Sequence, residues 1–309
     1  MSNVVIQSLP FGARDARRIA SLLDIPMHEI ELHRFPDGEL RVTTGPAAPT
    51  TIIYAPLDQP NDKLIAILFA CDVLRREGAK RLILVAPYLC YMRQDAAFRR
   101  GEAISQKVVG RLLSEVVDRI ITVDAHLHRT TEIKEIFPGI EVENLSAMPA
   151  IAEALRTAGL DVETIIVGPD AESEPWVSDL AGRIGVAHAV AQKIRHSDRS
   201  VDIALANPPM FKGRPILMID DIVSSGGTMV ACAKALVAAG SLSIDAIITH
   251  ALFPADVADK ITSAGVRSIR STHTVPHPTN TIVLDSMFMA ALVNELSWHL
   301  NPSAGQRGQ

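Results

Sequence analysis

Short apolar runs and amphipathic segments alternate along almost the whole chain. Residues 4–9, 51–55 and 81–86 are mainly apolar, which is typical of strands buried on both faces of a parallel sheet. Residues 13–23 and 62–76 read as helices. This alternation predicts an α/β fold with mostly parallel sheets and helices on both faces. Further strands are expected at 30–34, 40–43, 119–123, 163–167, 187–192, 201–205, 244–250, 267–271 and 281–284, and further helices at 105–116, 147–158, 175–184, 229–239, 256–264 and 287–299.

The pattern starts again near the middle of the 309 residues. We therefore predict an N-terminal domain at 1–145 and a C-terminal domain at 146–309, with the last helix as a candidate to pack back on the first domain. Residue identities show no repeat, so a duplicated fold is only a hypothesis at this point.

One stretch, residues 216–239, organises the rest. An apolar run leads to Asp220 and Asp221, where the strand is expected to end, and an Ala-rich helix follows the loop. Loop amides and a helix N-terminus together make an anion site. Glycine in such a loop lets the ligand come close to the backbone. The loop consists of five small residues: Ser224, Ser225, Gly226, Gly227 and Thr228.

The composition of this loop narrows the choice of anion. It lacks the Lys of a Walker A loop and the Gly-x-Gly-x-x-Gly of dinucleotide sites. Hydroxyls and amides suit a phosphate, whereas the two carboxylates suit sugar hydroxyls or a nearby Mg²⁺, so a phosphorylated pentose fits both halves. The alternative is purely structural: Asp-Asp closes the strand and Gly-Gly makes an ordinary turn.

The composition limits the cellular compartments and the classes of binding partner that we expect. With 48% hydrophobic and 21% charged residues, the chain has the composition of a soluble globular protein. A net charge of −5 gives no general attraction to nucleic acid or to anionic lipid, so we expect neither as a partner. Three widely spaced cysteines, no signal-peptide pattern and no membrane-length apolar run favour a cytoplasmic protein.

Two segments of the first domain concentrate polar chemistry. The turn 34–39 carries an aromatic ring and two carboxylates, although turn chemistry alone would explain it. The connection after strand 81–86 carries Arg93, Arg99 and Arg100 against the single carboxylate of Asp95. Arginine can contact phosphate with two hydrogen bonds and can stack on a base, but a solvated charged loop is the alternative.

Other polar residues follow strand ends, where ligands collect in α/β sheets. His126 lies two residues after Asp124, and His126 with His128 could face a metal or be structural. Asp170 could bind Mg²⁺ or cap the next helix. Lys193 and Arg195 alternate at a strand end, so both point to one side, which could also be a solvent-facing edge.

The motif Asp220-Asp221-x-x-Ser-Ser-Gly-Gly-Thr228 resembles the phosphoribosyl-pyrophosphate loop of the phosphoribosyltransferase-like fold, which usually has Thr at the place of Ser225. Together, in their order along residues 30–296, the motifs resemble those of ribose-phosphate pyrophosphokinases. The resemblance implies two phosphoribosyltransferase-like domains, each a mostly parallel sheet flanked by helices.

The resemblance also implies roles. It places ATP at Phe35, Asp37, Gly38, Glu39, Arg93, Gln94 and Asp95, and Mg²⁺ near His126 and Asp170. Lys193 and Arg195 match the catalytic basic pair, on a mobile loop that extends towards Ser200. Ribose 5-phosphate would be held by Arg195, Asp220, Asp221, Ser224, Ser225, Gly226, Gly227 and Thr228.

The implied reaction is Mg²⁺-dependent transfer of the diphosphoryl group of ATP to the 1-hydroxyl of ribose 5-phosphate, giving phosphoribosyl pyrophosphate and AMP. The implied assembly is a homo-oligomer, a dimer or larger, in which the turn 35–39 serves a neighbouring subunit's site. A phosphoribosyltransferase and a non-catalytic regulatory relative are the rival hypotheses.

Two segments depart from the usual family pattern. Glu172-Ser173 stand where many members have Gly-Gly, and Leu-His-Arg-Thr-Thr-Glu replaces the common residues after His126. Both changes resemble those of divergent, archaeal-type branches.

Overall fold

The computed structural model describes residues 2–127, 129–130, 132–197 and 200–300. Contacts divide the chain into two compact units. Unit 1 contains the described part of Met1–Leu145 together with that of Leu284–Gln309, and unit 2 is Ser146–Val283. None of the described helices is long and apolar enough to cross a bilayer.

Unit 1 is built on a six-stranded parallel sheet with the strand order β2-β1-β5-β6-β7-β8. Its central strands are buried on both faces, as the apolar runs predict. The strands are β1 (Val4–Ser8), β2 (Met27–Glu29), β5 (Thr50–Tyr54), β6 (Arg81–Ala86), β7 (Arg119–Val123) and β8 (Glu141–Leu145). An antiparallel hairpin of β3 (Glu31–Arg34) and β4 (Leu40–Thr43) is inserted between β2 and β5.

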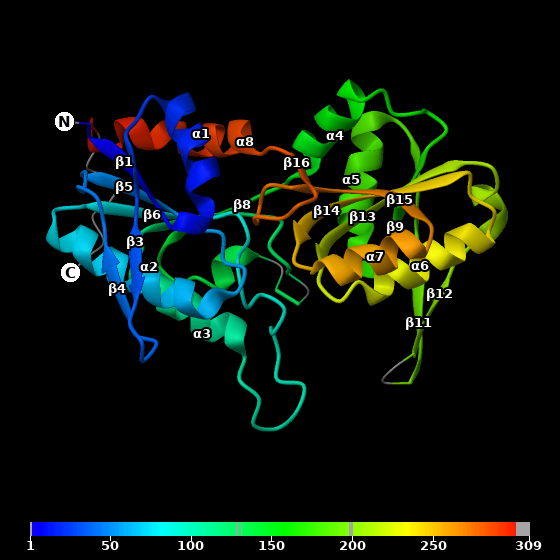
Figure 1. Cartoon of the computed structure of the whole chain (residues 1–309), viewed down its shortest axis with the longest axis horizontal. Helices are drawn as coiled ribbons and strands as arrows, with labels where there is room; N and C mark the ends of the chain where they lie inside the picture. The colour runs from blue at the N-terminus through cyan, green and yellow to red at the C-terminus, as the bar shows by residue number, and fades with distance from the viewer. Residues whose placement is uncertain (1, 128, 131, 198–199, 301–309) are drawn as a thin grey trace. The chain divides into compact units, whose positions relative to one another are not determined.

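Helices cover both faces of this sheet, with α1 and α8 on one face and α2 and α3 on the other (Figure 1). In α1 the apolar residues Ala16, Ile19, Ala20 and Leu23 recur at helical spacing and are buried, so one stripe of the helix faces the sheet. The helices are α1 (Ala13–Leu23), α2 (Pro60–Arg76), α3 (Ser105–Ser114) and α8 (Asp285–Leu292), with 3₁₀ turns η1 (Pro10–Gly12), η2 (Ile133–Glu135) and η5 (Val293–Leu300).

Unit 2 has a second six-stranded parallel sheet, with the order β10-β9-β13-β14-β15-β16. Helices α4 and α5 cover one face and α6 and α7 the other (Figure 1). The strands are β9 (Ile165–Gly168), β10 (Ala187–Val190), β13 (Pro215–Val223), β14 (Ser243–Ala251), β15 (Val266–Thr272) and β16 (Asn280–Ile282), and β11 (Gln192–Ser197) with β12 (Ser200–Ala204) forms a hairpin. The helices are α4 (Met148–Thr157), α5 (Glu174–Ile184), α6 (Gly227–Ala238) and α7 (Ala255–Ser263), with 3₁₀ turns η3 (Ala171–Ser173) and η4 (Pro208–Phe211).

Both sheets follow one topology. In each unit the second strand lies at the edge beside the first, and the third to sixth strands extend the other side of the first in chain order. In each unit a two-stranded hairpin is inserted between the second and third strands. The two units are therefore topological repeats, and the predicted α/β class with two helix-flanked parallel sheets is confirmed.

The structure corrects several predicted elements. Strands β2 and β8 were not predicted, because they are short and rich in polar residues. The strand expected at 187–192 ends at Val190, and Gln192 already belongs to the hairpin strand β11. The helix expected at 287–299 is α-helical only to Leu292 and continues as the 3₁₀ segment η5.

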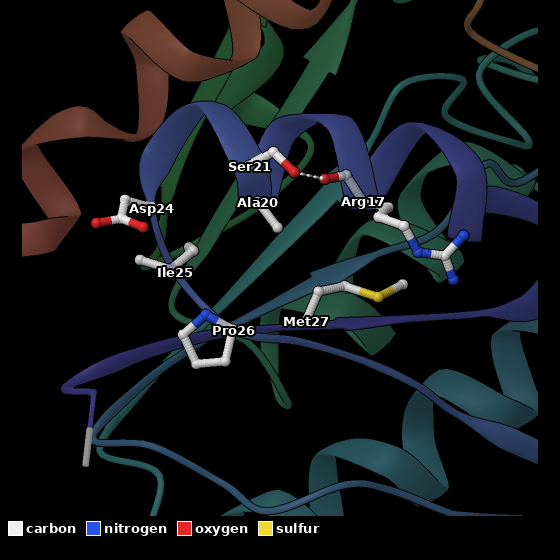
Figure 2. Close-up of a pocket in the computed structure, with 7 residues that line it drawn as sticks. All are labelled: Arg17, Ala20, Ser21, Asp24, Ile25, Pro26 and Met27. Carbon is white, nitrogen blue, oxygen red and sulfur yellow. Dashed lines mark hydrogen bonds between the residues drawn. The ribbon is translucent and has the colours of Figure 1, made fainter.

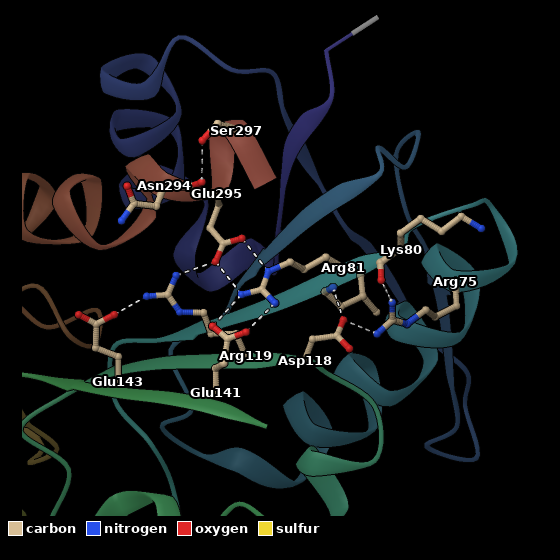
Figure 3. A network of polar contacts seen from close by, with 11 residues as sticks. Arg75, Lys80, Arg81, Asp118, Arg119, Glu141, Glu143, Asn294, Glu295 and Ser297 are labelled. Atoms are coloured by element: carbon tan, nitrogen blue, oxygen red, sulfur yellow. Dashed lines mark hydrogen bonds and ion pairs between the residues drawn. The ribbon is translucent and has the colours of Figure 1, made fainter. Parts of the chain in front are cut away.

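A buried ionic network joins the C-terminal segment to the sheet of unit 1 (Figure 3). Glu295 accepts hydrogen bonds from Arg81 Nε and Nη2, at 2.7 and 2.8 Å, and from Arg119 Nη1 at 2.7 Å. Arg81 also donates to both carboxylate oxygens of Glu141, at 2.9 and 3.0 Å. The Glu295 side chain is only 4% exposed. Burial alone would raise the pKa of Glu295, but the hydrogen bonds from Arg81 and Arg119 hold it below its ordinary value.

Glu295→Gln should lower the free energy of unfolding by about 3 kcal/mol, because it leaves two poorly exposed guanidinium groups without their shared counter-charge. The contribution of Glu295 is present above its ordinary pKa of 4.5 and is lost as the pH falls below that value. Urea unfolding should therefore show a gap between wild type and variant near neutral pH that narrows in acid. Glu153→Gln, which breaks an exposed ion pair with Arg156, is the matched control and should change stability by less than about 0.5 kcal/mol. An equal loss in both variants would contradict a special role for the buried network.

Candidate functional site

Asp220 and Asp221 lie within β13, and the prediction that this strand ends at these two residues is wrong, because β13 extends to Val223. Parallel pairing with β14 continues through Ile222↔His250 to Val223↔Ala251. The amide of Asp221 donates to Asp220 Oδ1 at 3.1 Å, and the amide of Ile222 donates to Asp221 Oδ1 at 2.8 Å. Asp221 is buried and Asp220 half-buried. Both carboxylates are therefore held by the backbone at the carboxyl end of the strand.

The loop after β13 leads directly into α6. Ser224, Ser225 and Gly227 are exposed, and Thr228 is half-buried. Gly226 is the N-cap of α6 with φ of 72°, and a Cβ atom there would lie 2.6 Å from Val257 Cγ1. Only glycine meets both conditions without strain. No N-cap side chain bonds to the first turn of α6, so its N–H groups can serve an anion.

Asp170 follows β9, the strand that pairs with β13. The strand order reverses direction between these two strands, which makes their carboxyl ends the topological switch point where α/β sheets bind ligands. Asp170 Oδ1 accepts a hydrogen bond from the amide of Glu172 at 3.1 Å, so it caps the 3₁₀ turn η3. The helix α5 that follows has Ser173 as its N-cap, so the capping hypothesis holds for the turn and not for the helix.

The carboxylates of Asp170 and Asp221 act on that of Asp220. Burial, together with the charges of Asp221 and Asp170, holds the pKa of Asp220 well above its ordinary value. Carboxylate oxygens are the ligands that Mg²⁺ prefers, and Mg²⁺ is commonly held by one or two of them together with substrate phosphates. The donor set at this switch point therefore fits Mg²⁺. Among the described residues, no group of three or more His, Cys, Asp or Glu side chains could hold a metal ion by itself, so Mg²⁺ at this switch point would take its remaining ligands from substrate phosphates and water.

Lys193 and Arg195 belong to the hairpin β11–β12 instead of ending a sheet strand, which corrects the sequence prediction. In the antiparallel register Lys193 is opposite Ile203, and Arg195 is opposite Val201. The structure describes the backbone of these two residues but not their side chains. They occupy alternate positions of one strand, as predicted. Their catalytic role stays a prediction.

The predicted nucleotide turn of unit 1 closes the hairpin β3–β4. The amide of Phe35 donates to Glu39 O, and the amide of Gly38 donates to Phe35 O, both at 2.9 Å. Asp37 Oδ1 accepts from the amide of Glu39 at 3.2 Å, and Gly38 has φ of 95°. The whole turn is exposed, and His33 packs edge-on against Phe35 with ring centroids 4.7 Å apart. Turn chemistry explains the backbone here, but not the exposed aromatic ring.

The second predicted nucleotide segment, Arg93 to Asp95, lies on the connection after β6. Arg93 is exposed and Gln94 half-buried. The side chain of Asp95 is only 2% exposed and pairs with Arg129 at 2.7 Å. The sequence analysis did not single out Arg129. Its only signal there was its place in the segment after His126 that departs from the family pattern.

His126 follows β7 and is half-buried. The residues before it form a tight turn: Asp124 has a positive φ of 37°, and the amide of Ala125 donates to Asn144 Oδ1 at 2.9 Å. Asn144 on β8 therefore fixes the start of the segment that carries His126. His128 lies outside the described residues. His126 and Asp170 belong to different units, and the role of each at a metal stays a prediction.

A pocket of about 520 Å³ lies elsewhere in unit 1, between the end of α1 and β2 (Figure 2). None of the residues that the sequence analysis assigned to a site lines it, so it does not belong to the candidate site. Its lining consists of Arg17, Ala20, Ser21, Asp24, Ile25, Pro26 and Met27.

Two family models match the chain in succession. The N-terminal domain of ribose phosphate pyrophosphokinase matches residues 8–116, and the phosphoribosyl transferase domain matches residues 143–276. The ribose-phosphate pyrophosphokinase of Methanopyrus kandleri is 31% identical over 89% of this chain and 94% of its own length. The chain belongs to the ribose-phosphate pyrophosphokinase family. A second relative, ribose-phosphate pyrophosphokinase 2 of Archaeoglobus fulgidus, is 34% identical over 84% of this chain and 89% of its own length. The family predicted from the sequence motifs is confirmed.

A solved structure supports the fold of this pyrophosphokinase-family chain. The crystal structure of phosphoribosylpyrophosphate synthetase from Mycobacterium smegmatis aligns with a TM-score of 0.81, covering 97% of this chain and 100% of the other, at 22% identity. At that identity the comparison concerns the fold alone.

The departure from Gly-Gly has a local structural consequence. Glu172 and Ser173 form the 3₁₀ turn η3, and the Ser173 hydroxyl donates to Asp170 O at 2.5 Å. Ser173 is buried, and the same hydroxyl lies where a Cβ on Gly168 would be. In this family member, therefore, side chains help to fix the backbone of the Asp170 loop.

Asp220→Asn should raise the free energy of unfolding of the ligand-free protein by about 1 kcal/mol near neutral pH, because it removes a charge that burial and the neighbouring carboxylates both disfavour. The folded state binds the Asp220 proton more tightly than the unfolded state does. The destabilising effect of Asp220 therefore appears as the pH rises above the ordinary value of 3.8, and the gain should be smaller in acid.

The matched control is Asp245→Asn. Asp245 accepts hydrogen bonds from Arg267 Nε at 3.1 Å and from Ser268 Oγ at 2.6 Å. Although burial works against it, these bonds hold the pKa of Asp245 below its ordinary value. This substitution should lower stability. Melting temperatures of both variants at two pH values check the pair, and a lower stability of Asp220→Asn near neutral pH would contradict the repulsion at the switch point.

Proposed function

We propose that the chain is a ribose-phosphate diphosphokinase that transfers the diphosphoryl group of ATP to the 1-hydroxyl of ribose 5-phosphate. The observation that carries this proposal is the pairing, at one switch point, of Asp220 and Asp221 with an uncapped, glycine-containing helix N-terminus. The similarity to ribose-phosphate pyrophosphokinases of Methanopyrus kandleri and Archaeoglobus fulgidus supports the same reaction.

In this proposal unit 2 holds the sugar phosphate. The loop amides and the hydroxyls of Ser224, Ser225 and Thr228 bind the 5-phosphate, with Gly226 and Gly227 letting the backbone come close. Asp220 and Asp221 accept hydrogen bonds from sugar hydroxyls. These hydroxyls are uncharged, whereas a phosphate would repel the two carboxylates. Arg195 adds a positive charge from the hairpin β11–β12.

Unit 1 supplies the nucleotide contacts. Phe35 offers a face for the base, and Asp37 and Glu39 offer acceptors for base or ribose groups on the same exposed turn. Arg93 and Gln94 offer donors for the triphosphate or the base. The exposure of the turn 35–39 is compatible with service to a neighbouring subunit, and we propose a homo-oligomer, a dimer or larger, that works in the cytoplasm.

The reaction requires alignment and charge neutralisation more than covalent catalysis. The 1-hydroxyl oxygen of the sugar bonds to the β-phosphorus of ATP. The bond from that phosphorus to the oxygen bridging the α- and β-phosphates breaks, AMP leaves with this oxygen, and the hydroxyl proton passes to solvent. Lys193 and Arg195 stabilise the charge that moves on to the leaving oxygen and the transferred group.

Asp170 and His126 are the residues that would hold Mg²⁺. When bound, Mg²⁺ neutralises phosphate charge and fixes the orientation of the phosphate oxygens. Asp170 caps η3 directly after β9, which supports this role. No specific observation favours a phosphoribosyltransferase or a regulatory relative.

Product analysis tests the reaction. Protein incubated with Mg²⁺, ATP and ribose 5-phosphate should yield AMP and phosphoribosyl pyrophosphate in equal amounts, measured by phosphorus NMR or chromatography. ADP as the product would mean single-phosphoryl transfer and would exclude attack at the β-phosphorus. No turnover by protein that binds both ligands would favour the regulatory alternative.

Lys193→Ala should lower kcat by a factor of roughly 100 or more while leaving the Kd for ATP within about threefold, because the lysine acts on charge that develops during transfer. Lys212→Ala is the matched control, since Lys212 is exposed near the amino end of β13, away from the switch point. A decrease in kcat of less than about tenfold for Lys193→Ala would rule out the proposed role.

A further inference from the structure

Side chains join two loops of unit 1 that carry candidate site residues. The loop after β6 carries Arg93 and Gln94, and the loop after β7 carries His126. Asp95 of the first loop accepts two hydrogen bonds from Arg129 of the second, one from the backbone amide at 3.2 Å and one from Nη1 at 2.7 Å. The two loops are neighbours because β6 and β7 pair in parallel, so their carboxyl ends meet at one edge of the sheet.

Arg129 is held by the first loop on two sides. Its guanidinium carbon lies 5.2 Å from the ring centroid of Phe98, in addition to the pairing with Asp95. The Arg129 side chain is 49% exposed, whereas that of Asp95 is 2% exposed. The arginine is therefore the outer partner, and it shields a carboxylate that solvent barely reaches.

A second contact joins the same two loops. The buried side chain of Gln106, at the start of α3, donates from Nε2 to Met92 O at 3.3 Å, and its Oε1 accepts from Thr130 Oγ1 at 3.3 Å. The backbone amide of Gln106 also donates to the carbonyl oxygen of Gln94 at 3.2 Å. The backbone on both sides of Arg93 is thus bonded to α3, while Asp95 is bonded to Arg129.

We propose that Arg129 is a positioning residue that fixes the Arg93–Gln94 segment for the nucleotide, and that Asp95 acts through Arg129 and not by touching the nucleotide. This inference rests on the proposed function. Among the described residues, Arg129 donates both hydrogen bonds to the Asp95 carboxylate, so the carboxylate loses its counter-charge if Arg129 is removed. With Arg129 in place, the Asp95 carboxylate is neutralised, so the exposed side chains of Arg93, Arg99 and Arg100 remain available to a triphosphate without a competing buried anion.

The test uses three variants: Arg129→Gln, Arg129→Lys, and a double variant that combines Asp95→Asn and Arg129→Gln. Arg129→Gln should raise the Kd for ATP by roughly tenfold, the scale of one lost charge-assisted hydrogen bond, and leave the Kd for ribose 5-phosphate unchanged. Arg129→Lys should recover part of the loss. The double variant should bind ATP no worse than Arg129→Gln, because no unpaired carboxylate remains. Arg76→Gln, which breaks an exposed pair with Asp72 on α2, is the control and should change neither Kd.

A second readout does not depend on the reaction. Trypsin cleavage after Arg99 and Arg100 in the ligand-free protein, mapped by mass spectrometry, should be at least about fivefold faster in Arg129→Gln than in wild type, since a loop released from its contacts opens more often. Unchanged cleavage would overturn the positioning role, as would an equal loss of affinity for both substrates. If wild type bound no ATP while cleavage still responded to Arg129, the proposed function would fail and the loop contact would stand.

Discussion

Desolvation and mutual repulsion of carboxylates at the carboxyl ends of β9 and β13 are the constraint on which the candidate site depends. The pKa of Asp220 is raised because the fold buries it beside Asp221 and Asp170. Such an arrangement costs stability until a cation or the hydroxyls of a ligand meet the charge, which is the common relation between a site and its scaffold. The adjoining loop and the N-terminus of α6 carry the opposite partial charge. The end of β13 therefore combines carboxylates that accept hydrogen bonds with amides that donate them.

The two units share a topology but carry their candidate site residues at different places in the fold. In unit 2 the third strand of the sheet, β13, carries Asp220 and Asp221 and continues into the amide-rich loop. In unit 1 the third strand, β5, is followed by Ala55, Pro56 and Leu57, which are buried and offer no acceptor side chain. Unit 1 instead bears its polar groups on the hairpin β3–β4 and on the loops after β6 and β7. A repeated sheet therefore presents two different sets of candidate site residues, as expected when function resides in loops grafted on a fold.

The C-terminal segment completes unit 1 by long-range contacts. Arg18 on α1 bonds to Asp285 at the start of α8, with Nε 2.6 Å from Oδ2. Glu295 follows in η5 and pairs with Arg81, which lies 214 residues earlier. A poorly exposed charge without a partner destabilises the fold because of its desolvation. These pairs therefore fix the position at which the C-terminal segment packs on unit 1, since any other register would leave the charges unpaired. The sheet of unit 1 thus depends on residues from both ends of the chain.

The sequence by itself determined the features that depend on neighbours along the chain. Apolar runs and helical spacing predict the fold class, and the small residues after Asp221 predict the loop and α6, because strand burial, helix propensity and glycine conformation are local properties. Its order of motifs also predicts the family. Only the tertiary structure decided which charges meet: Asp95 with Arg129, Glu295 with Arg81, and the raised pKa of Asp220. Pairing and desolvation depend on residues that are distant in sequence, and no local pattern records them.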